Sequence, residues 1–527
     1  MMQMVIKSYT YSDRAEGETQ YDVAGYSNEK IVPAHYIPAL VPMDKGNPFI
    51  EALPLPRTDE EIKMDYTKTL VSYNYDSVKD MSKLEKMLNV GTLRNIRFPL
   101  TFHKSLEFSF YNALLTSYRA RTLMENTEDE EPILCGDSGD STNAGFSLIG
   151  YSGCGKSSAL NILLSRHPQV IMHQTERGDI VPQVVYLVVN CIPNSNFSAL
   201  YEGIGDALDK AFHNTRPLYA DRIRRTGGLG KKMEIVKNYI EKFGIGMIIF
   251  DEIQLIDFSS TKENSFESLM ILANRTKVAV AVVGTEDARD KIFDELRTAR
   301  RIGTMINGNA YCEQKEFFDF LTRQLFQYQW FDKPVALTND IVDALYKVSK
   351  GIVDQLIGVY SCMHYDYLDR KKKPVINADY VYKIANKFYP GIQDILANME
   401  SLENTDKIRQ IRSQAETTIQ ETIDKVSQEE ASKTILTSQK TITNNQIQLR
   451  SVAATIRMLY DNFTDSQIET AFNKLMSRKS STTKSEKEIC RDIIEYLQKT
   501  PKRKVSDAAI IKPDLMHMPD TLGMEHV

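Results

Sequence analysis

A glycine-rich segment that ends in lysine and serine is the clearest chemical signature in the sequence. Residues 150–157 read Gly-Tyr-Ser-Gly-Cys-Gly-Lys-Ser, between an apolar run at 146–149 and a helical pattern at 158–164. This is the GxxxxGK[ST] pattern between strand and helix, in which backbone N–H groups and a helix N-terminus surround a polyphosphate. We predict that ATP contacts these residues: Gly150, Ser152, Gly153, Cys154, Gly155, Lys156, Ser157 and Ser158.

A pair of adjacent acids supplies the second half of the predicted site. Asp251 and Glu252 end the apolar run 247–250, which reads as a buried strand. We expect Lys156 to reach the β- and γ-phosphates, and the Ser157 hydroxyl and Asp251 to serve the Mg²⁺ ion. Glu252 would then polarise the attacking water.

Two further groups have a predicted catalytic role and an open alternative. Thr285 ends the apolar run 278–283, so it would orient the water if this strand lies beside the acid-bearing one. A local turn bond is its other interpretation. Arg297, Arg300 and Arg301 form a cluster from which one arginine could neutralise transition-state charge in a neighbouring subunit. A solvated helical face or a contact with a phosphate backbone is the alternative.

A cationic segment offers a local surface for nucleic acid. It contains three glycines, no acid and these five cations: Arg222, Arg224, Arg225, Lys231 and Lys232. Mobile cations and glycines suit close approach to a phosphate backbone, whereas an ordinary charged connector is the alternative. No helix presents a convincing set of base-reading residues, so any duplex binding should be independent of sequence. We assign no DNA contact to the basic runs 370–373 and 502–504.

Bulk properties limit the class of protein. The 527 residues exceed one hydrophobic core, and the net charge of −5 gives no global attraction to nucleic acid or anionic membrane. The six cysteines form no CxxC pair, which fits reduced thiols and a structural role. The N-terminus lacks the apolar core of a signal peptide, and no apolar run is long enough to span a bilayer. We therefore expect a cytoplasmic protein without a membrane partner.

The order of apolar and polar segments predicts an α/β fold with helical additions. Apolar β-branched runs alternate with helix-length segments, which specifies a parallel sheet flanked by helices, with a last strand expected at 310–312. The predicted regions are an extended N-terminal arm (1–60), a helical accessory region with an acidic linker (61–143), the α/β core (144–313), a helical lid (314–397), a helix and polar linker (398–447), a small helical region (448–499) and a flexible tail (500–527).

Several of these segments occur together, and in the same order, in one known family. They lie between about residues 44 and 360, at 46–54, 150–157, 167–173, 185–187, 249–254, 283–285 and 296–301. The chain thus resembles the TnsC family, the AAA+ regulators of heteromeric DNA transposons, including RNA-guided ones. The lid stretch 350–356 departs from many AAA+ lids, because it contains no arginine to contact the nucleotide.

The resemblance implies an AAA+ P-loop ATPase that uses ATP and Mg²⁺ and works in a prokaryotic cell. It implies a homo-oligomer, either a ring or a filament, on double-stranded DNA. This assembly would link a target selector of the TnsD or TniQ kind to the transposase TnsB and the endonuclease TnsA, and ATP hydrolysis would dismantle it. The resemblance also implies duplex contacts from the region after the second strand, including Ser195 and Asn196, and from residues 222–232.

Two other functions fit the phosphate-binding loop by itself. A signalling ATPase of the STAND type would oligomerise without DNA, but it would carry repeat-built sensor domains, and the sequence shows no periodic repeats. A small-molecule kinase would need neither the arginine cluster nor the flanking helical regions. The transposition regulator therefore remains our main hypothesis, with the signalling ATPase as the alternative.

Overall fold

The computed structural model forms two compact units, residues 1–426 and 427–527, which we describe separately. The structure describes residues 30–70, 73–125, 132–136, 145–193, 196–256, 266–286, 288–289, 303–391, 410–411, 413–430, 449, 452–453, 456, 463, 465–476 and 486–499. None of the helices within these residues is long and apolar enough to cross a membrane.

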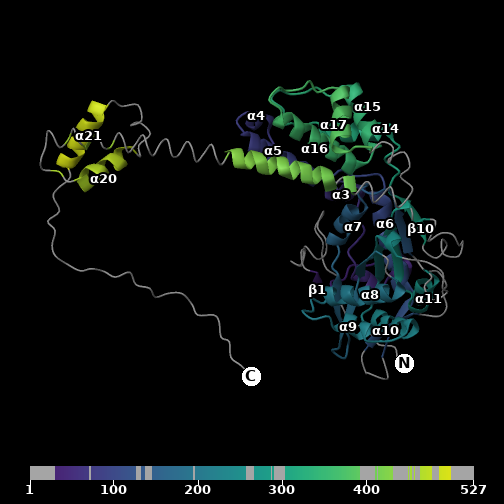
Figure 1. Cartoon of the computed structure of the whole chain (residues 1–527). Coiled ribbons are helices and arrows are strands. Elements are labelled where there is room, and N and C mark those ends of the chain that lie inside the picture. Colours follow the sequence, from purple (N-terminus) through teal and green to yellow (C-terminus); the bar gives the residue numbers. More distant parts are fainter. Residues whose placement is uncertain are drawn as a thin grey trace, which may run out of the picture. The chain divides into compact units, whose positions relative to one another are not determined.

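The centre of the first unit is a five-stranded parallel sheet (Figure 1). Its strand order is β10 (Thr304–Asn307), β4 (Gly145–Ile149), β9 (Ala279–Gly284), β8 (Met247–Asp251) and β7 (Tyr186–Asn190). Each neighbouring pair is parallel. Strand β9 therefore lies between the strand that leads into the glycine-rich loop and the strand that carries the two acids. The predicted parallel sheet is confirmed.

Both faces of this sheet are buried, which explains why its strands are almost continuously apolar. On β8, Ile249 joins a core with α6 (His103–Arg119), whereas Phe250 joins a second core with α8 (Phe197–Ala211), α10 (Leu229–Lys242) and α11 (Phe266–Thr276). On β9, Ala281 and Val282 alternate in the same way. The period of two along each strand thus divides the side chains between two helical layers.

The expected strand at 310–312 is wrong, because the edge strand β10 lies at Thr304–Asn307. In β10 only Ile306 is buried, so the strand lacks the apolar run that marks the inner strands. Tyr311 and Cys312 are buried, but they lie in the turn that leads out of the sheet.

The segments before the sheet pack against it. β1 (Ile31–Pro33) pairs with β5 (Val170–Gln174), which pairs with β6 (Ile180–Val184) in a small second sheet. The predicted accessory helices are present as α3 (Asp59–Asp65), α4 (Tyr75–Val78), α5 (Lys83–Gly91) and α6, together with α2 (Pro48–Glu51). The predicted region also contains an unexpected hairpin, β2 (Arg121–Glu125) with β3 (Pro132–Gly136). The N-terminal arm, where it is described, is thus part of the core.

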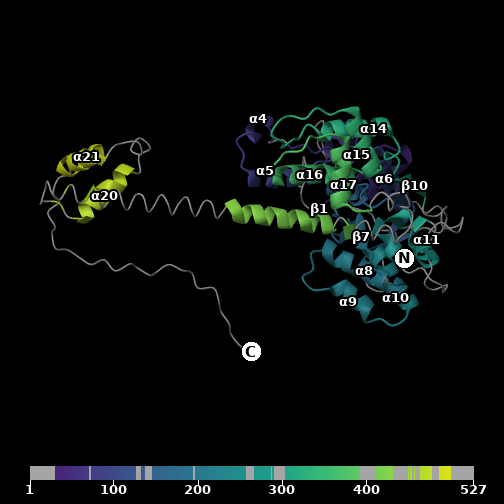
Figure 2. The same ribbon diagram turned by 45° about the horizontal axis from the view of Figure 1, so that its top comes forward.

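The predicted helical lid follows the sheet. It consists of α14 (Lys315–Leu325), α15 (Asn339–Ser349), α16 (Val353–Asp369) and α17 (Ala378–Phe388). Figures 1 and 2 show these helices beside α4 and α5 at one end of the unit, opposite α8, α9 (Leu218–Arg224) and α10. Residues 413–430 form a further helix, whose Ala415 and Val426 are buried in the same core as the lid.

The second unit has a small core of its own. Helices α20 (Asp465–Met476) and α21 (Glu486–Lys499) pack through apolar residues that include Phe472 and Ile489. Both helices lie within the small helical region predicted at 448–499, whereas the predicted tail 500–527 lies outside the described residues.

Candidate active site

The predicted phosphate-binding loop connects β4 to α7 (Lys156–Ser165). Gly153 and Gly155 have φ values of +84° and +99°, which side-chain-bearing residues rarely adopt. Gly150 is fixed by its surroundings, because a Cβ atom there would lie 2.9 Å from Asn309 Oδ1 and 3.0 Å from Cys154 Sγ. The sequence thus folds into a tight loop that leads directly into a helix N-terminus, which is a suitable site for phosphate.

The ammonium group of Lys156 lies inside this loop. Its Nζ donates to the carbonyl oxygens of Gly150 at 2.7 Å and of Tyr151 at 2.9 Å, and the side chain is buried. A cation enclosed by backbone carbonyls can transfer its hydrogen bonds to the oxygens of a polyphosphate. This position agrees with the predicted role of Lys156.

Ser157 and the first acid meet as the sequence predicted. The Ser157 hydroxyl lies 3.3 Å from Asp251 Oδ2, across the strand β9 that separates β4 from β8. Burial raises the pKa of Asp251. The hydrogen bond from the Glu252 backbone N–H group opposes this effect, as do Lys156 and Ser157, while the charge of the Glu252 carboxylate adds to it. Two hard oxygen donors, one of them a desolvated carboxylate, fit Mg²⁺ chemically. Ser157 and Asp251 would hold the ion.

Glu252 and Thr285 lie on neighbouring strand ends, as the predicted water-activating site requires. Glu252 has a left-handed backbone with φ of +57°, and its N–H group donates to Asp251 Oδ1 at 2.9 Å. Thr285 follows β9, which pairs with both β4 and β8, so the condition for its predicted role is met. Gln254 joins them, since it donates to Glu252 Oε2 and accepts from the Thr285 N–H group.

Asn309 is a site residue that the sequence analysis missed. It is buried, it accepts from the Tyr151 N–H group at 2.6 Å, and it donates to Glu286 Oε1 at 2.8 Å. Asn309 therefore connects the start of the phosphate-binding loop to the residue after Thr285. An asparagine just beyond an unrecognised edge strand gave no signal in the sequence.

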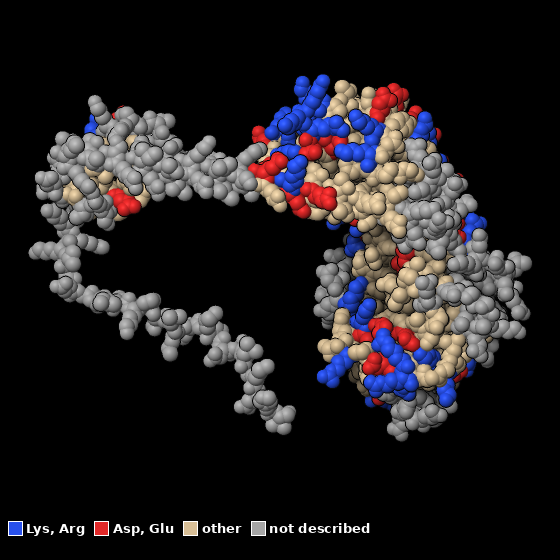
Figure 3. All heavy atoms as spheres, viewed as in Figure 1, with Lys and Arg blue, Asp and Glu red and all other residues tan. Residues whose placement is uncertain are grey.

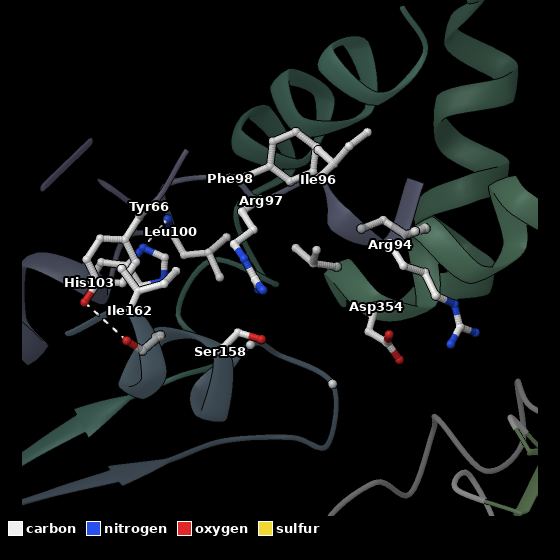
Figure 4. Close-up of a pocket in the computed structure, with 15 residues that line it drawn as sticks. Tyr66, Arg94, Ile96, Arg97, Phe98, Leu100, His103, Ser158, Ile162 and Asp354 are labelled. Atoms are coloured by element: carbon white, nitrogen blue, oxygen red, sulfur yellow. Dashed lines mark hydrogen bonds between the residues drawn. The ribbon is translucent and has the colours of Figure 1, made fainter. Parts of the chain in front are cut away.

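The structure also reveals a pocket of about 120 Å³ next to the loop (Figure 4). It is lined by the accessory segment 94–103, by the loop with the first turns of α7, and by the start of α16. Figure 4 shows Arg97 extending toward Ser158, with Arg94 and Asp354 at the other side. Arg97 is half-buried and has no ion pair within the described residues, so it could contact an anionic or polar ligand.

The opposite end of this pocket is apolar and aromatic. Burial lowers the pKa of His103 to about 3, so its ring is neutral, and it stacks on Tyr66 with a centroid distance of 4.0 Å. Ile96, Leu100 and Ile162 also line this end. Flat apolar walls beside a phosphate-binding loop can accept the base of a nucleotide.

We expected the five cations of the segment 222–232 to be free, but the structure pairs some of them with acids. Lys232 is buried and its Nζ lies 2.6 Å from Glu202, and Arg224 lies 2.6 Å from Asp206. The neutralising acids come from α8, which the local sequence could not show. Arg222 and Lys231 are exposed, and Arg225 is 82% exposed although it contacts Asp221. Figure 3 shows basic and acidic side chains interspersed at this end of the unit.

Several predicted site residues lie outside the described residues. These are Arg297, Arg300 and Arg301 of the arginine cluster, and Ser195. The neighbouring Asn196 is described, and its side chain caps α8 by accepting from the Ala199 N–H group at 3.2 Å. This capping bond gives Asn196 a structural role in addition to the predicted DNA contact.

The fold and the loop geometry define an ATPase of the AAA+ P-loop class. Consistent with this, residues 140–292 match the model of the AAA domain family. That segment contains the glycine-rich loop, both acids and Thr285. No curated protein matches the chain at a significant level.

Solved structures resemble the chain only distantly. A Walker-type ATPase of Pyrococcus abyssi is 14% identical over 49% of this chain and 70% of its own, with a TM-score of 0.29. The Aeropyrum pernix ORC1 protein in complex with DNA is 13% identical over 68% and 78%, with a TM-score of 0.31. The Aeropyrum pernix ORC2 protein is 13% identical over 47% and 62%, with a TM-score of 0.27.

Proposed function

We propose that the protein is an ATP-dependent regulator of DNA transposition of the TnsC type. It assembles on double-stranded DNA as a ring or filament, links a TnsD- or TniQ-type target selector to TnsB and TnsA, and leaves the DNA when ATP is hydrolysed. The ordered set of motifs between residues 44 and 360 supports this proposal. The AAA domain at 140–292 supplies the nucleotide dependence.

One contact carries the DNA-binding part of the proposal. Lys232 Nζ lies 2.8 Å from Ser198 Oγ, so the start of α10 meets the start of α8. These are the two segments from which the resemblance implies duplex contacts, and 34 positions separate the two residues. Gly227, Gly228 and Gly230 have open space around them, which permits close approach of a phosphate backbone.

The described residues suggest how hydrolysis proceeds. Lys156 and the backbone of the loop bind the phosphates. Ser157 and Asp251 would hold Mg²⁺, which would supply positive charge to neutralise the phosphate oxygens. Glu252 accepts a proton from the attacking water, and Thr285 orients that water. An arginine among Arg297, Arg300 and Arg301 would complete the site of a neighbouring subunit, which makes hydrolysis depend on assembly.

The decisive experiment measures duplex binding and particle size in three nucleotide states. The protein is mixed with a fluorescent duplex of arbitrary sequence, without nucleotide, with ADP, or with a non-hydrolysable ATP analogue. We expect large assemblies and cooperative binding only with the analogue. Assemblies that form with the analogue but ignore DNA would instead favour the signalling ATPase.

A matched pair of variants locates the DNA surface. Arg222→Ala combined with Lys231→Ala removes two exposed cations near the start of α10. Lys371→Ala combined with Lys372→Ala removes two exposed cations after α16 and serves as the control. The first variant should bind DNA more weakly for all sequences and lower the slope of log K against log salt by about 2. Equal effects of both variants would move the duplex contact elsewhere.

A further inference from the structure

Gln254 occupies a buried position between the two strand ends that carry the hydrolytic residues. The residue is only 2% exposed. Its Nε2 atom lies 2.5 Å from Glu252 Oε2, and its Oε1 atom accepts from the Thr285 N–H group at 3.1 Å. Both polar atoms of the Gln254 amide are thus hydrogen-bonded to the two residues that would activate and orient the attacking water.

We infer that Gln254 is a positioning residue, which holds the Glu252 carboxylate toward the end of β9 for the activation of water. This inference rests on the proposed role of Glu252 in hydrolysis. Because β9 lies next to β4, the amide bridge directs the carboxylate toward the side of the sheet where the phosphate-binding loop begins. A carboxylate fixed in this way needs little reorganisation before it accepts a proton.

The backbone around Glu252 supports the need for such a restraint. Glu252 adopts the left-handed region with φ of +57°, which a residue with a side chain adopts only when its surroundings enforce it. The backbone N–H group of Glu252 bonds to Asp251, which fixes one end of the residue. The Gln254 amide fixes the other end, at the carboxylate.

Gly284, the residue before Thr285, leaves the space that the Gln254 amide occupies. A Cβ atom at Gly284 would lie 2.9 Å from Gln254 Oε1 and 2.8 Å from Ile253 Cγ2. Gly284 has no unusual φ, so its small size rather than its flexibility is required here. The Gly-Thr pair at the end of β9 and the Glu-Ile-Gln sequence after β8 are therefore packed together, although Gln254 and Gly284 are 30 positions apart in the sequence.

Two variants of Gln254 test this role. Gln254→Met keeps the length of the side chain but can neither donate nor accept a strong hydrogen bond. Gln254→Glu keeps the shape and the acceptor for Thr285, but its ionised carboxylate cannot donate to Glu252. We expect each to lower kcat about 10-fold or more, while KM and the affinity for a fluorescent ATP analogue change less than about 2-fold.

A double-mutant comparison separates positioning from packing. In a Glu252→Gln background, the same Gln254 substitutions should cause no further loss of kcat, because the group they position is already disabled. Equal losses in both backgrounds, or a parallel loss of analogue binding, would overturn the inference. If Glu252→Gln itself retains the wild-type kcat, the proposed role of Glu252 fails, and that result is read independently of any Gln254 variant.

Discussion

The hydroxyl of Tyr311 ties the lid to the phosphate-binding loop. It lies 3.2 Å from the carbonyl oxygen of Cys154 in the loop and accepts from the N–H group of Val353, the first residue of α16, at 3.3 Å. A second tie runs from the Asp354 N–H group to the Gly153 carbonyl oxygen at 3.3 Å. The orientation of the lid is thus linked to the conformation of the loop.

The variant Tyr311→Phe should weaken nucleotide binding. It removes the two hydrogen bonds through which Tyr311 links α16 to the loop. We expect the Kd for ATP to rise about 5- to 30-fold, since each bond is worth about 1 kcal/mol and 1.4 kcal/mol is tenfold. Titration with a fluorescent ATP analogue measures this. Tyr346→Phe is the matched control, because its hydroxyl bonds to the Cys312 carbonyl oxygen at 3.1 Å, away from the loop. A similar Kd for both variants would contradict the link.

Arg97 should contribute to ATP affinity more than Arg94 does. Both line the pocket, but Arg94 lies 2.6 Å from Glu416 in the helix at 413–430. Arg97 has no ion pair within the described part of the chain, and it extends toward Ser158 (Figure 4). We expect Arg97→Ala to lower ATP affinity about 10-fold or more, as for a lost charged hydrogen bond. Isothermal titration of both variants checks this, and a larger effect of Arg94→Ala would reverse the assignment.

Removal of the Ser157 hydroxyl should change the requirement for Mg²⁺. Ser157→Ala deletes one of the two oxygen donors that meet at 3.3 Å. The Mg²⁺ concentration for half-maximal hydrolysis should then rise several-fold, because one ligand must be replaced by water. Ser165→Ala, at the exposed last residue of α7, is the control. An unchanged Mg²⁺ dependence of the Ser157 variant would exclude this residue as a ligand.

The sequence predicted those parts of the site that lie within short segments. The loop at 150–157 and the acids Asp251 and Glu252 are each specified by local spacing, and apolar runs located four of the five strands of the sheet, all except the edge strand β10. The sequence did not predict the order of the strands in the sheet. The position of Thr285 beside the acids therefore depended on the assumption that its strand is next to the strand that ends in Asp251. The observed order, with β9 between β4 and β8, meets this assumption.

The parts that were missed depend on contacts between distant segments. The pocket combines the accessory segment 94–103 with the loop and with α16, and no local pattern connects these three regions. The same reason explains the cationic segment: Lys232 looked unneutralised in its own sequence, but Glu202 of α8 pairs with it. Local charge counts therefore overestimated the free cations.

Buried neutral histidines should make stability fall with decreasing pH. Burial lowers the pKa of His364 and His173 to about 4 and that of His103 and His167 to about 3. The unfolded chain binds these protons near pH 6.5 and the folded chain does not, so stability is complete above pH 6.5 and declines as pH falls toward 4. At pH 5.5, each such histidine costs about 1.4 kcal/mol.

Denaturant unfolding at pH 7.5, 6.5 and 5.5 tests this dependence. His364→Gln should reduce the pH dependence of the unfolding free energy by about one proton below pH 6.5. His213→Asn is the control at an exposed position with φ of +54°, which asparagine tolerates. An identical pH dependence in wild type and the His364 variant would show that this ring is not a buried neutral group.

The C-terminal unit should unfold without disabling the ATPase. Phe472 is 1% exposed in a core that it shares with Ile468, Ile489 and Ile493, and this core is separate from those of the first unit. Phe472→Ala should cost about 3–5 kcal/mol, which is enough to unfold so small a unit. The variant should lose the helical signal and proteolytic protection of residues 465–499 while keeping the wild-type kcat. Asn473→Ala, at the exposed next position, should keep both properties. A loss of kcat in the Phe472 variant alone would mean that the ATPase depends on the fold of this unit.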